Sequence, residues 1–406
     1  MKQRQKHIIA YFLLFIFLVS CLEEVPLETQ NSEIENLVVV EATITDQNIQ
    51  QTIKLSFSKK FEEETFLPLS NAQVTVLSSE GGSFSFFEQS PGIYVSTNTF
   101  SANPESTYQL NVETPGGRRI ISEQEQIAGS ANIEEILAVP TINDKGIEGI
   151  ALRVATSSLF GVTRFFRYEY QETYKIIAPN WNPFEFDIIN DQFPDFEVGI
   201  KPRIEEQQTC FGNNSSLSII LNETVSNDGN DAFEFRFLSR EDPFLAHRYS
   251  VNLVQYTQSA KAANYWKTLQ DFSDQENIFS QVQPGFLSGN LESISDDNLV
   301  VGFFEVASVT QKRVFINRDD FYNQEENRPY FLDCSAIGAT PLFSLGAHQM
   351  GVTTSPLIDA IRAGLIVYYG VNENPTDVLG PYFVTARECG DCTALGSNVK
   401  PEFWTD

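Results

Sequence analysis

The sequence predicts a mainly β protein, and three observations support this class. Between Val38 and Val112, apolar residues alternate with polar ones in short runs, which is typical of strands that bury one face. Turn-forming pairs such as Pro91-Gly92 separate these runs. Hydrophobic residues make up 42% of the chain and aromatic residues 12%, which suits a protein with a packed core.

Residues 37–128 are predicted to form an immunoglobulin-like β-sandwich, because roughly seven short strands follow one another there. One apolar set consists of Val38, Val40, Ala42 and Ile44. Within this region, the segment Pro68–Gly82 resembles the strand and hairpin of carboxypeptidase-regulatory-like modules. Such modules usually bind or act as spacers, so this resemblance implies a non-catalytic unit.

Residues 134–406 are predicted to form a larger, mostly β domain that contains at least one packed amphipathic helix. The helix is expected over Gln258–Phe272, with Ser259 near its N-cap, because apolar residues recur there at helical spacing. The residues on its apolar face are Ala262, Tyr265, Leu269 and Phe272. A helix of this kind packs on its own sheet more often than on a partner.

Residues 1–20 have the pattern of a bacterial lipoprotein signal peptide. Three basic residues precede an apolar run of 12 residues, Ile8–Val19, whereas a membrane-crossing helix needs about 20. The run ends at Leu18-Val19-Ser20-Cys21, which resembles the lipobox, whose cysteine receives a diacylglycerol group. We therefore expect lipidation at Cys21. The alternative is an ordinary secretory signal with an incidental cysteine.

Residues 21–36 are predicted to form an acidic tether. This segment carries five glutamates and few apolar residues, as a solvated linker does. Glu23 and Glu24 resemble the signal that Bacteroidota use to send lipoproteins to the outer face of the outer membrane. The expected location is therefore the outer membrane, with the protein facing the cell exterior. The alternative is a tether that is merely acidic.

The net charge argues against a nucleic-acid partner. The chain has 27 Lys and Arg against 54 Asp and Glu, a formal net charge of −27, without a basic cluster that would offset it. Such a surface repels phosphate backbones and anionic headgroups.

The sequence offers little for catalysis, and we expect a protein that is not an enzyme and needs no cofactor. His7 leaves with the signal peptide, and neither His247 nor His348 lies in an HExxH motif. GxSxG, P-loop and GxGxxG motifs are absent from the sequence. A Ser-His-Asp triad assembled from distant residues remains an alternative, although His247 borders a strong strand pattern that favours a core or edge role.

We expect no metal site. The densest polar loop contains Asp228, Asn230 and Asp231, whose oxygens suit calcium, but the EF-hand spacing and its final glutamate are missing. A hairpin turn is the favoured interpretation of this loop.

Four further cysteines are candidate disulfide partners. An even number of cysteines in an exported chain favours disulfides, and four of them allow three connectivities. They are Cys210, Cys334, Cys389 and Cys392. The last two form a CxxC motif that suits a redox pair or half a zinc site less well, because no thioredoxin-like unit surrounds it and no second close pair exists.

Two aromatic clusters, Arg164–Tyr174 and Asn180–Phe186, mix rings with polar groups. Exposed rings of this kind form binding platforms for sugars, peptides or proteins, whereas buried rings in a β core give the same composition. Burial is the favoured interpretation for any single ring.

Several sequence segments along the chain resemble those of a lipoprotein family of the Bacteroidota. This family is known only as a domain of unknown function, "forty-two forty-nine". Their order and the final CxxC followed by KPEFW make the resemblance specific. The matching segments are Glu35–Asp46, Asn71–Gly82, Gly92–Ser122, Arg167–Tyr174, Ala263–Leu269, Val301–Ile316 and Cys389–Trp404.

This resemblance implies a lipid-anchored outer-membrane protein that is often encoded beside TonB-dependent transporters. The expected function is that of an accessory or substrate-capturing partner of such a β-barrel transporter. One alternative is a structural or assembly subunit of an envelope protein machine, and another is a cryptic hydrolase. The family brings no catalytic residues, and the lipidated cysteine maps onto Cys21.

Substitution of Cys21 by alanine should release the protein from the membrane fraction, because acyl chains supply the binding free energy at roughly 0.8 kcal/mol per buried methylene. Membrane fractionation with mass spectrometry of the mature N-terminus measures this. A Cys21→Ala protein that remains in the membrane, or a wild-type N-terminus without acyl groups, would contradict the lipoprotein assignment.

Overall fold

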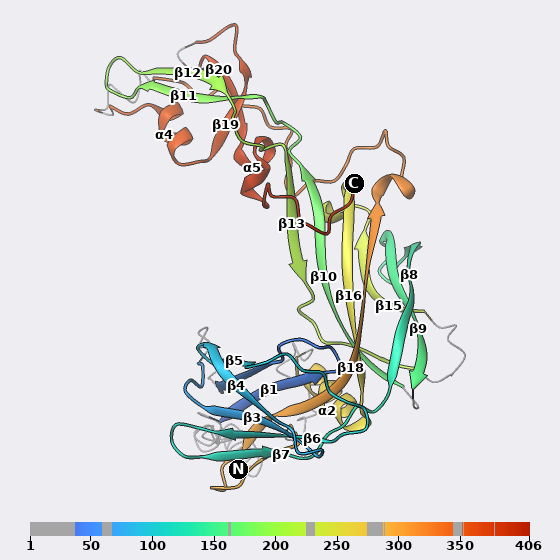
Figure 1. Ribbon diagram of the computed structural model, residues 1–406. Coiled ribbons are helices and arrows are strands. Elements are labelled where there is room, and N and C mark those ends of the chain that lie inside the picture. Colours follow the sequence, from blue (N-terminus) through green and yellow to red (C-terminus); the bar gives the residue numbers. More distant parts are fainter. Residues whose placement is uncertain are drawn as a thin grey trace, which may run out of the picture.

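The computed structural model describes residues 37–58, 67–160, 164–224, 232–273, 287, 289–343, 351, 353–376 and 378–406 (Figure 1). Strands form most of the regular structure in these residues, so the predicted mainly β class is confirmed. The signal peptide, the tether and Cys21 lie outside the described residues, as do His348 and the Asp228–Asp231 loop.

The first strands curve around one hydrophobic core at the lower end of the molecule (Figure 1). They are β1 (Val38–Thr45), β2 (Thr52–Phe57), β3 (Gln73–Ser78), β4 (Ser83–Ser90), β5 (Ile93–Ser96), β6 (Tyr108–Glu113) and β7 (Arg119–Ser122). The predicted alternation is present in β1, where Val38, Val40, Ala42 and Ile44 are all buried. Their Cβ atoms point to the same face because successive side chains of a strand alternate.

Two strands from the second half of the chain complete this sheet. Strand β18 (Val300–Asn317) pairs with β1 in parallel, and β17 (Leu291–Ser293) pairs with β7. The immunoglobulin-like arrangement of residues 37–128 and the boundary near residue 128 stay predictions. The structure adds that residues 291–307 contribute hydrogen bonds and core side chains to this region.

A glycine permits the close approach of β18 to β1. Gly302 pairs with Val40 and has a φ of 138°, a backbone conformation that other residues rarely adopt. A Cβ atom at Gly302 would lie 2.0 Å from the Val40 carbonyl oxygen. Any larger residue here would therefore push the two strands apart.

The second half of β18 belongs to the middle of the molecule, which we call the body. Here β18 pairs with β16 (Arg248–Gln258), followed by β10 (Phe165–Ile177) and β13 (Thr209–Ser215), while β14 (Ile220–Glu223) also pairs with β10. A three-stranded sheet faces them, formed by β8 (Ser130–Ile142), β9 (Glu148–Phe160) and β15 (Phe233–Ser239). Apolar side chains from both sheets form the body core.

Helix α2 (Ala260–Ser273) confirms the predicted amphipathic helix. The backbone N–H of Ala262 donates to the hydroxyl of Ser259, the predicted N-cap residue, at 3.1 Å. Ala262 and Tyr265 are buried, and the ring of Tyr265 lies 5.3 Å from that of Phe303 on β18. The helix therefore covers the outer face of β18, on the side opposite the β1–β7 core.

The far end of the molecule is a small unit that we call the tip module (Figure 1). It comprises the described residues of 179–206 and 332–391. Its elements are β11 (Phe184–Asn190), β12 (Glu197–Pro202), α4 (Pro356–Arg362), β19 (Ile366–Val371), β20 (Tyr382–Ala386) and α5 (Arg387–Gly390). Strands β11 and β12 form one hairpin and β19 and β20 form another, with a common core between them.

A buried ion pair lies where the body meets the lower sheet. Glu305 of β18 is 2% exposed and Arg167 of β10 is 5% exposed, and Arg167 Nη2 lies 3.4 Å from Glu305 Oε2. The guanidinium also stacks between the rings of Tyr256 and Trp266, at 4.0 and 4.4 Å from their centroids. Burial opposes the charged form of Arg167, but the nearby Glu305 and Glu169 carboxylates hold its pKa above the usual value.

Other polar groups complete the surroundings of Glu305. Trp266 Nε1 donates to one carboxylate oxygen at 3.2 Å, and Gln258 Nε2 donates to the other at 2.9 Å. The hydroxyl of Thr43, on β1, donates from 3.4 Å. One carboxylate thus contacts β1, β10, β16 and α2.

Replacement of Glu305 by alanine should lower the free energy of unfolding by about 3 kcal/mol, because it leaves the Arg167 charge buried with only the half-exposed Glu169 as a partner. Urea unfolding followed by circular dichroism measures this change. Glu41→Ala is the control, because its ion pair with Lys54 is exposed and should contribute less than about 1 kcal/mol. Equal losses in the two variants would contradict a special role for the buried pair.

Candidate functional site

Two disulfides join the four predicted cysteines, and they settle the connectivity that the sequence leaves open. Cys210 pairs with Cys392, and Cys334 pairs with Cys389. The CxxC cysteines therefore bond to two different distant partners rather than to each other. Cys389 and Cys392 are fully buried, which fits structural bridges and not an accessible redox pair.

The disulfides brace the tip module and its junction with the body. Cys334–Cys389 closes the tip itself, whereas Cys210 lies on β13, so its bond to Cys392 ties the end of the tip to the body sheet. The N–H of Asn180 donates to the Cys389 carbonyl at 2.9 Å beside these bridges. The two disulfides thus add covalent support to the small core of the tip.

The tip core consists mainly of aromatic and aliphatic side chains from both hairpins and α4. Phe186, Tyr368 and Tyr382 form a triangle of rings with centroids 5.6–5.8 Å apart, in edge-on geometry. Leu357 and Ile358 of α4 are buried against them. This core fixes the orientation of the residues that the tip presents outward.

The outer surface of the tip is apolar to an unusual degree. The exposed large hydrophobic residues here are Phe184, Ile189, Phe193, Ile200, Ile204, Ile337, Leu365, Tyr369, Val371, Val378, Leu379 and Phe383. Ile204 is 97% exposed and Val378 is 74% exposed. Phe184 and Ile200 lie on the same face of the β11–β12 hairpin as the core residue Phe186, so they extend the margin of the tip core.

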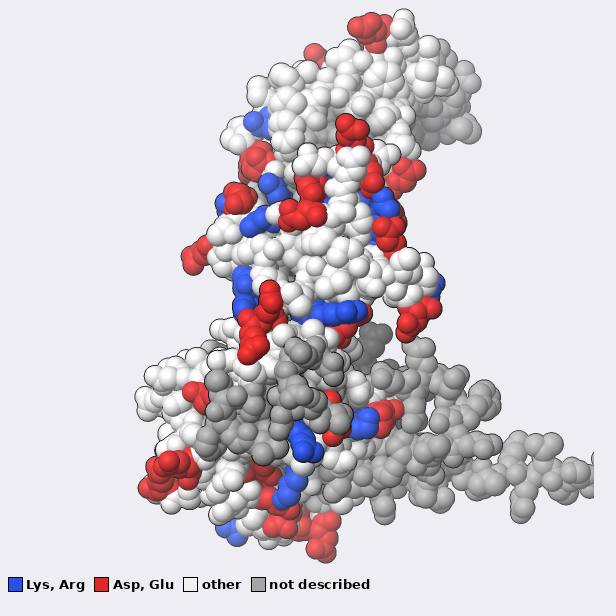
Figure 2. Space-filling view, turned by 90° about the vertical axis from the view of Figure 1, so that its right-hand side faces the viewer, with Lys and Arg blue, Asp and Glu red and all other residues white. Residues whose placement is uncertain are grey.

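One of the two segments that form the tip carries few charges. Residues 334–386 contain only four charged side chains, Asp359, Arg362, Glu373 and Asp377, whereas residues 179–206 contain nine. On the face in Figure 2, the upper end is largely uncharged, whereas acidic and basic residues alternate across the middle. Many exposed apolar side chains in one small unit suggest a place where another molecule binds.

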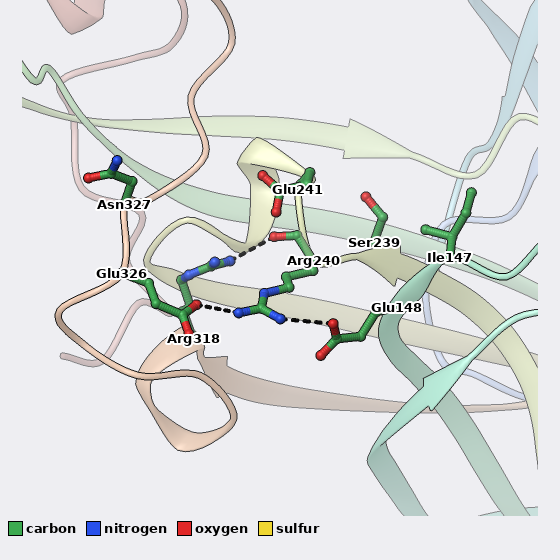
Figure 3. A pocket seen from close by; sticks show the side chains of 8 residues that line it. All are labelled: Ile147, Glu148, Ser239, Arg240, Glu241, Arg318, Glu326 and Asn327. Carbon is green, nitrogen blue, oxygen red and sulfur yellow. Dashed lines mark hydrogen bonds and ion pairs between the residues drawn. The ribbon is translucent and has the colours of Figure 1, made fainter.

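The second candidate is a charged pocket of about 560 Å³ on the body (Figure 3). Arg240 spans it, with Nη1 donating to Glu148 at 2.8 Å and Nη2 donating to Glu326 at 2.7 Å. Hydrogen bonds to Glu326 and Glu148 raise the pKa of Arg240. Arg318 also lines the pocket. The sequence gives no signal for this site, because its residues come from three distant segments.

His247 is partly buried, as the core or edge role expected from the sequence requires. Burial lowers its pKa to about 4, helped by the positive charges of Arg328 and Lys175, so its imidazole is neutral at pH 7. Its carbonyl accepts the N–H of Arg318 at 3.0 Å. Within the described part of the chain, no group of three or more His, Cys, Asp and Glu is placed to hold a metal ion.

The two predicted aromatic clusters have different environments. In Arg164–Tyr174, the rings of Phe166, Tyr168 and Tyr174 are buried in the body core, and Tyr174 stacks on Phe244 at 4.1 Å. In the second cluster, Phe184 is 41% exposed on the tip. Only the second cluster therefore contributes a ring to a candidate binding surface.

The double variant Cys334→Ser, Cys389→Ser should lose up to about 4 kcal/mol of stability, because the bridge closes a 55-residue separation. Limited proteolysis followed by mass spectrometry should then show faster cleavage between residues 335 and 388. Cleavage elsewhere is the internal control and should keep its rate. A tip that resists proteolysis as well as the wild type would contradict this bracing role.

No described helix is both long enough and apolar enough to cross a membrane.

No curated protein matches the chain. A solved structure of a DUF4785 family protein from Legionella pneumophila is similar over 54% of this chain at 10% identity, with a TM-score of 0.17. That match spans 52% of the Legionella protein, about half of its length. The family described as "Domain of unknown function (DUF4249)" matches residues 23–313, most of the sequence, and the chain belongs to this family.

Proposed function

We propose that this protein is a non-enzymatic, lipid-anchored outer-membrane protein that docks through its tip module on a TonB-dependent β-barrel transporter and helps to capture that transporter's substrate. The observation that carries the proposal is the group of exposed apolar side chains on the tip. Family membership and the lipobox-like segment support the envelope location.

Exposed apolar side chains on a braced scaffold favour association. Fully burying a side chain that is almost entirely exposed, such as Ile204, contributes about 1.5–3 kcal/mol. The disulfides and the ring triangle hold these residues in place before binding, so little conformational entropy is lost when a partner covers them. A few such residues at the centre of an interface supply most of its binding free energy.

Charge favours a different protein as the occupant over a second copy. With a net charge of −27, two copies of this chain repel each other. Acidic residues such as Asp195 and Glu197 border the apolar surface on the β11–β12 hairpin. The complementary partner surface is therefore apolar at its centre and basic at its rim.

The position of the tip relative to the lipid-anchored end suits docking on a transporter in the same membrane. Strand β1, the first described strand, belongs to the sheet at the end of the molecule opposite the tip (Figure 1). A lipid on Cys21 would hold that end near the membrane, and residues 22–36 would give it reach. Sharing one membrane raises the effective concentration of the protein and its transporter for each other.

The triple variant Phe184→Ser, Ile200→Ser, Phe383→Ser should reduce recovery of a β-barrel transporter at least about tenfold in pulldowns from mildly solubilised outer membranes. Its thermal stability should fall only modestly, because the three side chains are 37–41% exposed and lie at the margin of the tip core. Ile142→Ser with Leu217→Ser is the matched control, since these exposed apolar residues lie on the body.

Two results would contradict the proposal. One is a wild-type protein that recovers no β-barrel. The other is equal recovery by the tip variant and the wild type.

A further inference from the structure

The charged pocket lies where three segments of the body meet (Figure 3). Ile147 and Glu148 come from the start of β9, and Ser239, Arg240 and Glu241 from the end of β15 and the turn after it. Arg318, Glu326 and Asn327 come from the segment after β18. The cavity has a size at which proteins commonly bind small molecules.

The two arginines in this pocket differ in their partners. Arg240 is neutralised by the carboxylates of Glu148 and Glu326. Arg318 is 3% exposed, yet it forms no ion pair with any described carboxylate. Its Nη1 donates to the Arg240 carbonyl at 2.8 Å, its Nε has no hydrogen-bond partner, and its guanidinium lies over the Tyr322 ring at 4.7 Å.

An unpaired buried charge is costly, and proteins normally pair such a group. Burial lowers the pKa of Arg318, and neighbouring acidic groups do not fully offset the effect. A carboxylate that entered the pocket beside Arg318 would supply the missing partner. The free energy of that charge-assisted hydrogen bond would contribute to binding.

A second unpaired charge faces the same pocket. Glu241 is exposed, forms no ion pair with a described residue, and points toward the two arginines in Figure 3. With Glu148, Glu241 and Glu326 around the cavity, a doubly charged phosphate would be repelled. The lining therefore suits a ligand that carries one negative and one positive group.

We propose that this pocket binds a free α-amino acid, with its carboxylate on Arg318 and its ammonium group on Glu241. Asn327 and Ser239 offer further hydrogen-bonding groups, and Ile147 offers an apolar contact for the side chain. The inference is independent of docking through the tip, because the two surfaces share no residue. A failure of one therefore leaves the other standing.

Three ligands of matched shape test the requirement for both charges. Isothermal titration calorimetry on the purified full-length protein in detergent compares L-phenylalanine, 3-phenylpropanoate, which lacks the amino group, and 2-phenylethylamine, which lacks the carboxylate. We expect L-phenylalanine to bind at least about tenfold more tightly than either analogue, as the loss of a charged hydrogen bond predicts.

Variants of the pocket residues test whether the amino acid binds at this site. Arg318→Met should abolish binding, and Glu241→Gln should weaken it about tenfold. Glu241 is exposed, so this variant decides the question even if Arg318→Met fails to fold. Glu325→Gln, an exposed neighbour that does not line the pocket, is the control and should bind like the wild type.

Three outcomes would overturn the proposal. They are no binding of any of the twenty amino acids at millimolar concentration, equal affinity for L-phenylalanine and 3-phenylpropanoate, and unchanged affinity in Glu241→Gln.

Discussion

The carboxylate of Glu305 connects the two halves of this molecule. It lies on β18, which pairs both with β1 in the lower sheet and with β16 in the body. Around it stand a hydroxyl from β1, a guanidinium from β10, an amide from β16 and an indole from α2. Because each partner comes from a different element, the network favours one mutual arrangement of these elements over others that would bury the same apolar area.

The tip relies on a different means of stabilisation. Its core is small, so apolar burial alone gives the tip less stability than the larger cores of the body and the lower sheet have. The two disulfides supply that support, one within the tip and one between the tip and β13. Apolar residues such as Ile204 and Val378 can therefore remain exposed on a fixed scaffold instead of collapsing into the core.

The two candidate surfaces are chemically distinct and suit different occupants. The tip exposes many apolar side chains, which favours another folded protein with a matching surface. The pocket beside Arg318 is polar and of limited volume, which favours a small charged molecule. A protein that holds a small ligand on its body and a transporter at its tip would combine capture and delivery.

The sequence by itself determined the local features of this protein. Alternation marked β1, helical spacing with Ser259 marked α2, and the even number of cysteines indicated disulfides. Periodicity reports which face of an element is buried, so these features need no knowledge of distant residues. Only the tertiary structure decided which cysteines pair, that β18 belongs to both the lower sheet and the body sheet, and that Arg318 lies near Glu241. These depend on pairs far apart in the chain, such as Thr43 and Glu305 at a separation of 262 residues, and no local pattern encodes such contacts.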